Sequence, residues 1–194
     1  MKKNKAETKE TILKLIGIAR HYFTDHGFAN TSLEAIVKDA NMTRGALYHH
    51  FPNKKELFRI VFESVHEQVG KRVEQEAEKG EDGWEQLQLG CRAFLAAAIE
   101  EDHKRIMLID GPAVLGWEAW RTFDQKNAMR LLHEQLTGMQ AQGLIKEMSV
   151  EALTHLLSGA LNEASLWCAQ HQNQQQAVEE TMAVVELFLQ GLKR

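Results

Sequence analysis

The sequence has little of what metal sites, disulfides or membrane segments require. Of its 194 residues, two are proline and two are cysteine, Cys91 and Cys168, which lie far apart without metal-ligand spacing. This usage is typical of a reducing compartment and predicts no structural disulfide. No stretch approaches the roughly 20 apolar residues of a membrane helix. No apolar core follows the N-terminal lysines, so we expect no secretory signal, no membrane partner and a cytoplasmic location.

Motifs for catalysis are also missing. The sequence contains no Gly-rich phosphate loop and no Gly-x-Ser-x-Gly elbow, and neither cysteine has a histidine-containing catalytic context. Glu63 and His66 form one Glu-x-x-His pair, whereas a di-iron bundle needs two such pairs and two further glutamates. We therefore expect no enzyme, no metal and no cofactor, and we interpret Glu63 and His66 as a surface pair.

The residues that are present predict an all-α protein. Apolar residues make up 44% of the chain and recur at helical spacing. A first helix is expected over residues 7–26, with Gly27 as its end. A long helix is expected over about 53–79, and others over 84–99, 117–142 and 149–170, the last of these capped by Ser149. A basic arm with Lys2, Lys3, Lys5 and Lys9 would precede the first helix; we favour a frayed, solvated arm over one that contacts phosphates or the minor groove.

Residues 31–57 predict two short helices joined by a tight turn, which is the layout of a helix-turn-helix. Thr31 and Glu34 have the spacing of a capping box. Asn41 can adopt the left-handed backbone that ends a helix, and Thr43 is an N-cap candidate for the next helix. Pro52 would stop that second helix. The stretch therefore favours a nucleic-acid-binding head over an ordinary solvated turn.

The distribution of charge supports this interpretation. Residues 1–55 hold ten Lys/Arg and five Asp/Glu, whereas residues 56–194 hold thirteen and twenty-two, within a net charge of −4. A basic head on an acidic body suits a protein that presents one end to DNA. Lys54 and Lys55 open a helix, where the dipole disfavours cations unless an anion such as a phosphate binds there.

The same stretch resembles the DNA-binding domain of the TetR/AcrR family of bacterial transcriptional regulators. The resemblance is dense over about residues 10–61. Asn41 and Thr43 stand where the family usually has Gly and most often Ser, and both replacements keep the turn and the hydroxyl cap. The resemblance is carried by Thr31-Ser32, Ile36, Ala40, Thr43-Arg44-Gly45-Ala46-Leu47-Tyr48-His49-His50-Phe51, Asn53-Lys54 and Leu57.

The resemblance implies an N-terminal three-helix helix-turn-helix domain in residues 1–55 and a C-terminal helical bundle for ligand binding and dimerisation in residues 56–194. It implies a homodimeric repressor on a near-palindromic double-stranded DNA operator, released by a small-molecule effector. The helix at 43–51 would enter the major groove. Arg44, and with it Gly45 and His49, would reach base edges. Phosphate and flanking contacts would come from Tyr48, His50, Lys54, Thr31, Ser32 and Thr43.

The effector would bind in the body, as in regulators of this family. Large side chains gather near helix breaks at Asp110-Gly111-Pro112 and Gly116, which leaves room for a pocket with an apolar or aromatic ligand. The alternative is ordinary core packing, with Asp110 as a helix cap and His103 exposed to solvent. The candidate ligand residues are Phe94, His103, Met107, Asp110, Trp117, Trp120, Met129 and Trp167.

The last helix has a wider apolar surface than one core contact needs. Val178, Met182, Val185 and Leu189 form one stripe, and Val184, Leu187 and Phe188 lie beside it. We expect the last two helices of two subunits to form a four-helix dimer interface.

Two other interpretations stay open. A DNA-binding regulator could sense thiol oxidation through Cys91 or Cys168, although isolated cysteines on apolar helix faces more often only pack. A helical metal- or ligand-binding protein is the more distant alternative.

Overall fold

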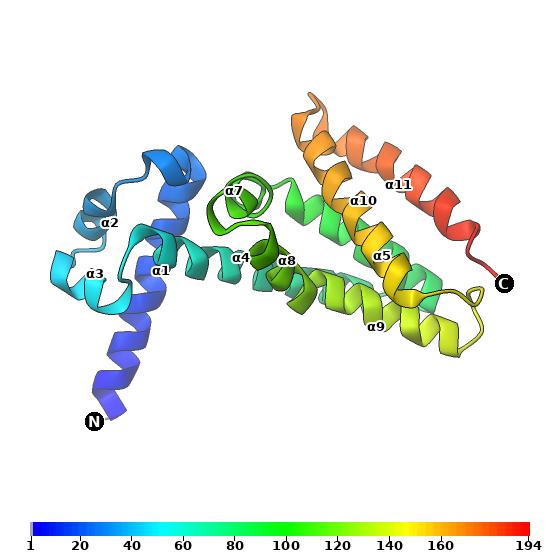
Figure 1. Cartoon of the computed structure of the whole chain (residues 1–194), viewed down its shortest axis with the longest axis horizontal. Helices are drawn as coiled ribbons and strands as arrows, with labels where there is room; N and C mark the ends of the chain where they lie inside the picture. The colour runs from blue at the N-terminus through cyan, green and yellow to red at the C-terminus, as the bar shows by residue number, and fades with distance from the viewer. Residues whose placement is uncertain (1) are drawn as a thin grey trace. The chain divides into compact units, whose positions relative to one another are not determined.

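The computed structural model describes residues 2–194, with side chains described from Glu10 onward, so the side chains of the lysine arm lie outside the described residues. The chain is helical (Figure 1), and within residues 2–194 the β structure is one isolated bridge between Ile145 and Lys193. The predicted all-α class is confirmed. In the part of the chain that the structure describes, no helix combines the length and apolar character needed to cross a membrane.

The chain forms two compact units that interleave along the sequence. The first contains residues 1–65 and 101–119, and the second contains residues 66–100 and 120–194. The predicted division between residues 55 and 56 was drawn by expected function and does not coincide with the boundaries of these packing units, and it stays a prediction.

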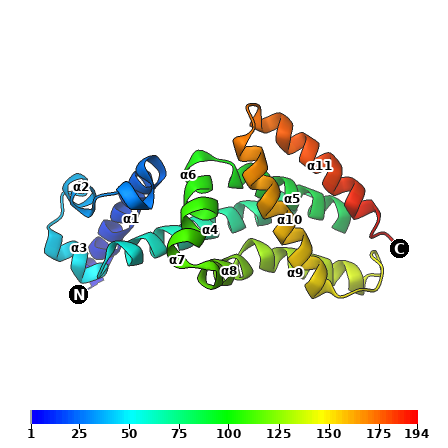
Figure 2. The same cartoon turned by 45° about the horizontal axis from the view of Figure 1, so that its top comes forward.

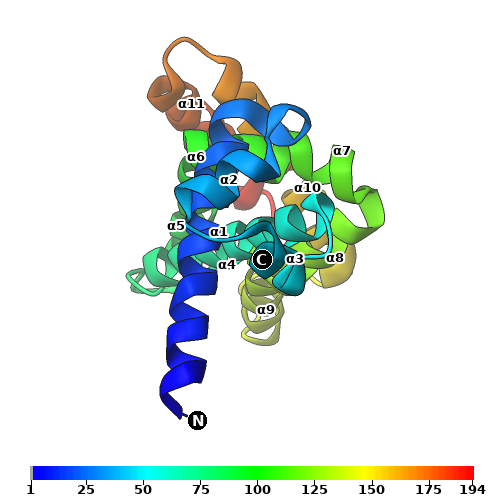
Figure 3. The ribbon, with the colours of Figure 1, turned by 90° about the vertical axis from the view of Figure 1, so that its left-hand side faces the viewer.

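The first unit is built on α1 (Lys2–Asn30), which contacts α2 and the segment that follows residue 100 (Figure 3). Its aromatic core includes Phe23, Phe58 and Phe62, all fully buried, with the Phe23 and Phe58 rings 5.1 Å apart edge to face. The other helices are α2 (Leu33–Asp39), α3 (Arg44–His50), the first part of α4 (Lys54–Ala77), α6 (Glu101–Lys104), the π-helix η1 (Arg105–Asp110) and α7 (Gly111–Leu115).

A kink at Gly27 shapes the end of α1. Gly27 has φ 72° and ψ 169°, so the helical conformation breaks where the sequence predicts and resumes for one turn to Asn30. The Nη1 of Arg105 donates to the carbonyl oxygens of Thr24 and Asp25, at 3.2 and 3.1 Å. The Oδ2 of Asp110 accepts from the backbone N–H of Phe28 at 2.8 Å. Two side chains of η1 thus satisfy backbone groups that the kink releases.

The second unit contains α5 (Gly83–Ala98), most of α8 (Trp117–Lys126), α9 (Ala128–Ala141), α10 (Val150–Gln170) and α11 (Gln174–Gln190). Helix α10 packs on α5, α9 and α11 (Figure 2). The predicted cap of α10 is confirmed, because the Ser149 hydroxyl accepts from the N–H of Ala152 at 3.1 Å.

The single helix predicted over residues 117–142 is wrong. Asn127 has φ −118° and ψ −113°, which separates α8 from α9. Its side-chain Nδ2 donates to the carbonyl oxygen of Phe123 at 2.8 Å. Asparagine readily replaces backbone hydrogen bonding in this way, and apolar periodicity alone does not reveal such a break.

Candidate nucleic-acid interface and ligand cavity

The turn between α2 and α3 is fixed by local backbone bonds. Asn41 adopts a left-handed conformation with φ 52°, as predicted. Its N–H donates to the carbonyl of Lys38 at 3.1 Å, and the N–H of Met42 donates to the carbonyl of Val37 at 3.0 Å. These bonds use the last carbonyls of α2, so the conformation of the turn is set by residues that lie close to it in the sequence.

Helix α3 is anchored on one side and open on the other. The Thr43 hydroxyl accepts from the N–H of Ala46 at 3.2 Å, which confirms the predicted N-cap. Leu47 is fully buried and holds the helix on the core, whereas His50 is half-buried. The exposed residues of this segment are Thr43, Arg44, Gly45, Tyr48 and His49.

The guanidinium of Arg44 places a positive charge on the exposed side of α3. Its guanidinium forms an ion pair with the carboxylate of Glu34 on α2, and both side chains are about two-thirds exposed. Exposed pairs of this kind contribute roughly 0.2–1 kcal/mol. The guanidinium can therefore leave Glu34 for a stronger acceptor, such as the edge of a guanine.

The predicted capping box between Thr31 and Glu34 is wrong. Thr31 is buried, and its hydroxyl lies near the carbonyl oxygens of Gly27 (2.7 Å) and Tyr22 (3.0 Å), both on α1. Ser32 takes the N-cap position instead, but its hydroxyl donates to the Glu34 carboxylate at 3.0 Å rather than capping the helix. Thr31 bonds to α1 because the kink at Gly27 leaves carbonyl oxygens beside it.

The ammonium group of Lys54 is hydrogen-bonded within the protein. Its Nζ donates to the carbonyl oxygens of Phe28, Ala29 and Thr31 at 2.7, 3.1 and 3.0 Å, and it lies 4.6 Å from the centre of the Phe28 ring. An ammonium group has three N–H donors, so these carbonyls use its full capacity. The neighbouring Lys55 is exposed.

The second unit contains a cavity of about 330 Å³. Its walls come from α4, α5, α8, α9 and α10, so residues far apart in the sequence meet there. The apolar side chains of the wall include Val73, Leu87, Phe94, Met129, Leu132 and Leu161.

A buried polar cluster borders this cavity. The Oδ2 of Asp124 accepts from the Arg121 guanidinium at 3.0 Å and from the Ser158 hydroxyl at 3.1 Å. Burial raises the pKa of Asp124, against the opposing effects of these two partners. The Nη2 of Arg121 lies 3.3 Å from Nδ1 of His155. The sequence analysis missed Asp124, although it follows Trp120 by four residues and so falls on the apolar stripe of α8.

The structure does not bring the eight predicted ligand residues together. Phe94 and Met129 line the cavity. Trp120 is buried elsewhere in the second unit, and Trp167 is exposed on α10. The other four belong to the first unit, where His103 and Met107 are buried, Asp110 bonds to α1 as described, and Trp117 is exposed. The alternative interpretation of His103 as a solvent-exposed residue is wrong.

The remaining titratable candidates show the effect of burial. Cys91 lines the cavity, and burial raises its thiol pKa to about 12, which leaves almost no reactive thiolate at neutral pH. Burial lowers the pKa of His66 to about 3. His66 is buried and Glu63 pairs with Arg59 at 3.1 Å, so the interpretation of Glu63 and His66 as a surface pair is wrong.

Comparison with known proteins finds matches to both the helix-turn-helix segment and the helical body that contains the cavity. Residues 15–61 match the model of the bacterial regulatory proteins of the tetR family, and residues 84–192 match the tetracyclin repressor-like C-terminal domain. A TetR-family transcriptional regulator from Pectobacterium atrosepticum is 34% identical, with 97% of this chain and 96% of that chain covered and a TM-score of 0.81.

Two curated relatives match over shorter segments. The HTH-type transcriptional regulator AcrR of Shigella flexneri is 31% identical over 108 residues, which cover 55% of this chain and half of AcrR. A probable acrEF/envCD operon repressor of Escherichia coli is 47% identical over 57 residues, or 29% of this chain and 26% of that protein. With both of its domains matched and a near full-length relative above 30% identity, the chain belongs to the TetR family of DNA-binding transcriptional regulators.

Proposed function

We propose that this regulator is a homodimeric repressor that acts in the cytoplasm, binds a near-palindromic operator and is released when a small molecule enters the cavity of the second unit. It would act by binding alone, without enzymatic turnover. The observation that carries the proposal is the geometry of α3. This helix is capped by Thr43 and anchored on the core by Leu47, and its other side, with Arg44, Tyr48 and His49, is exposed.

Direct contacts with DNA would come from the exposed side of α3. Arg44 and Gly45 lie at its N-terminal end, which is the part of a recognition helix that meets base edges. His49 would follow them into the groove, and Tyr48 and His50 would contact phosphates. Ser32 and Thr43 would add flanking contacts.

We assign Thr31 and Lys54 a supporting role rather than a direct one. Both bond to carbonyl oxygens at the end of α1, and a phosphate would have to replace those bonds. Lys55, exposed in the first turn of α4, is the better candidate for a phosphate contact.

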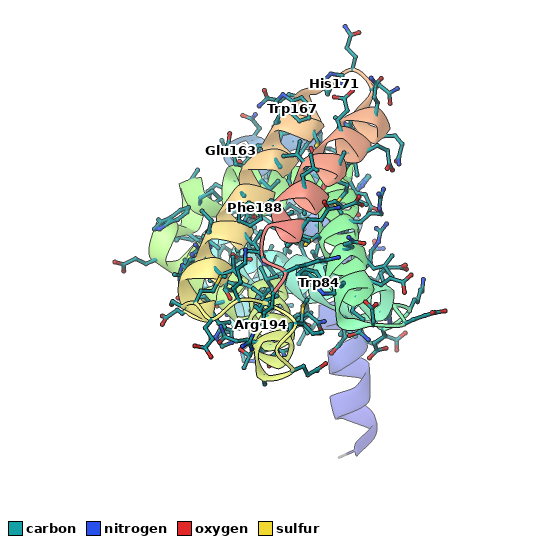
Figure 4. The ribbon with its side chains drawn as sticks, turned by 90° about the vertical axis from the view of Figure 1, so that its right-hand side faces the viewer. Trp84, Glu163, Trp167, His171, Phe188 and Arg194 are labelled. Atoms are coloured by element: carbon teal, nitrogen blue, oxygen red, sulfur yellow. The ribbon has the colours of Figure 1, made fainter. Side chains whose placement is uncertain are left out.

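Dimerisation through α10 and α11 is supported by an exposed apolar face. Its residues are Leu156 and Trp167 on α10 and Val184, Leu187 and Phe188 on α11, each between 42% and 68% exposed. Figure 4 shows Glu163 and Trp167 along α10, His171 just past its end, and Phe188 on α11. Monomeric proteins seldom leave so many large apolar side chains together in water. A second copy of the chain would cover them in a four-helix interface.

The test is selection of bound DNA from a random pool at two salt concentrations. We expect a short inverted repeat, with affinity falling steeply as salt rises. Arg44→Ala should then lose about 1–3 kcal/mol of discrimination at one base pair of each half-site. Leu187→Asp should make the protein monomeric and weaken operator binding, as sedimentation and fluorescence anisotropy would report. An Arg44→Ala variant with unchanged preference would contradict the assigned reading residue.

A further inference from the structure

The lining of the cavity has a one-sided charge. Four carboxylates border it: Asp124 on α8, Glu134 on α9, and Glu74 and Glu78 at the α4 end of the wall. Among the described residues that line it, none is lysine, arginine or histidine. A carboxylate ligand such as a fatty acid would therefore meet repulsion without a compensating cation, so the lining disfavours anions.

The four carboxylates differ in how far they are neutralised. Arg121 pairs with Asp124 and Arg130 pairs with Glu134 at 2.7 Å. Glu74 and Glu78 form no ion pair with any side chain that the structure describes. Glu74 lies in the last turn of α4 and Glu78 directly follows its end, with the Glu78 N–H donating to the Glu74 carbonyl at 2.9 Å, so their negative charges add at the same edge of the cavity.

The rest of the wall suits an apolar body. Leu87, Phe94, Met129 and Leu161 line the interior, and the volume of about 330 Å³ lies at the lower end of the roughly 300–1,000 Å³ of ligand pockets. Asp124 is only 2% exposed, and its carboxylate is already paired with Arg121. The negative charges left for a ligand are therefore those of Glu74 and Glu78.

We propose that this cavity binds a small organic cation, an ammonium group carried on an apolar body, and that this cation is the effector. The assignment as effector rests on the proposed function, whereas the preference for a cation rests on the cavity alone. The ammonium would lie toward the carboxylates of Glu74 and Glu78, and the apolar body would contact Phe94 and Met129.

The experiment compares three probes of similar shape by calorimetry on the full chain: 4-phenylbutylamine, 4-phenylbutanol and 4-phenylbutanoate. We expect the amine to bind about tenfold more tightly than the alcohol, and the carboxylate to bind more weakly than both. Equal Kd values for the three probes, tighter binding of the alcohol or carboxylate, or no binding of the amine at millimolar concentration would overturn the proposal.

Charge-removing variants locate the binding. The double variant Glu74→Gln, Glu78→Gln changes exposed side chains and should fold normally. It should weaken the amine several-fold and leave the alcohol unchanged. Asp124→Asn should weaken the amine less than the double variant does, once its melting curve shows that it folds, because Arg121 already neutralises this carboxylate. The matched control is Glu67→Gln, an exposed carboxylate on α4 outside the cavity, which should leave the binding of all three probes unchanged. Equal losses for amine and alcohol in the double variant would overturn the charge argument.

A separate assay distinguishes failure of this inference from failure of the proposed function. Operator binding is measured with and without saturating amine. Release of DNA supports both conclusions. Selective amine binding without DNA release would remove the role of effector and leave the cation site standing. Absence of operator binding in every condition would overturn the proposed function, while the calorimetric preference still decides the ligand class.

Discussion

The helix-turn-helix and the cavity are shaped by contacts of very different range. In the helix-turn-helix, Thr43 bonds to Ala46 and Asn41 to Lys38, each three residues away. Around the cavity, Asp124 bonds to Ser158, 34 residues away, and the side chain of Gln135 donates to the carbonyl of Gly83, 52 residues away. The recognition surface is therefore preorganised by its own sequence, whereas the cavity exists only when five helices pack.

The largest loss of stability is expected at Gly27, because the kink in α1 that supports the helix-turn-helix is itself held by the long-range contacts of Arg105. Gly27→Ala should lower the free energy of unfolding by about 3 kcal/mol, because its backbone conformation is essentially restricted to glycine. A Cβ there would also lie 2.8 Å from Nη2 of Arg105. The measurement is urea unfolding.

Gly17→Ala is the matched control for this substitution. Gly17 is on the same helix, and a Cβ there meets nothing within 4 Å. The free energy of unfolding of Gly17→Ala should rise by up to about 1 kcal/mol, because alanine has a higher helix propensity than glycine. Equal stability of the two variants would show that the kink is not a requirement of the fold.

The second prediction concerns the pH dependence of stability that the buried His66 gives to the second unit. The pKa of His66 is about 3 in the folded protein and 6.5 in its ordinary state. Between these values the unfolded chain binds the proton and the folded one does not, so stability falls as pH drops from 6.5 toward 3. At pH 5 the loss is about 2 kcal/mol.

His66→Leu should remove this part of the acid sensitivity, measured as the difference in unfolding free energy between pH 7 and pH 5. The exposed residue His133 supplies the control, because His133→Leu should leave that difference as it is in the wild type. A His66→Leu variant with the wild-type pH dependence would show that the imidazole is not held in its neutral form.

The third effect separates two adjacent lysines. Lys54→Met should lower stability by about 1–2 kcal/mol, because three carbonyl oxygens lose a charged donor. Lys55→Met should leave stability within about 0.5 kcal/mol and reduce the slope of DNA affinity against salt by about one. The opposite assignment of these two results would make Lys54 the phosphate contact.

The smallest effect tests the local cap. Thr43→Ala should cost about 1 kcal/mol, the usual value for a lost N-cap. Ser32→Ala should cost almost nothing, since the Ser32 hydroxyl makes no cap bond. Thermal unfolding of both variants provides the comparison, and a greater loss in Ser32→Ala would contradict the observed caps.

The range of the contacts also explains what the sequence could predict. Asn41 and Thr43 were predictable because their partners lie within the same turn. Thr31 was assigned wrongly because its partners are on α1, and the break at Asn127 was missed because a single side chain causes it. Asp124 was not predicted as a site residue, because its partner Ser158 is 34 residues away and comes near only when the helices pack. The large apolar side chains of Phe94 and Met129 were predicted correctly to lie at the cavity. Side-chain type alone could not distinguish them from Met107 or Trp117, which lie elsewhere.

The position of Trp167 has a spectroscopic consequence. Trp167 is 47% exposed on the proposed dimer face, and the centre of its ring lies 5.5 Å from that of His171. Tryptophan emission shifts to shorter wavelength when the indole leaves water. A variant that keeps Trp167 as its single tryptophan would therefore report subunit association by its own fluorescence on dilution. The buried Trp120, kept alone in a second variant, would serve as the concentration-independent reference.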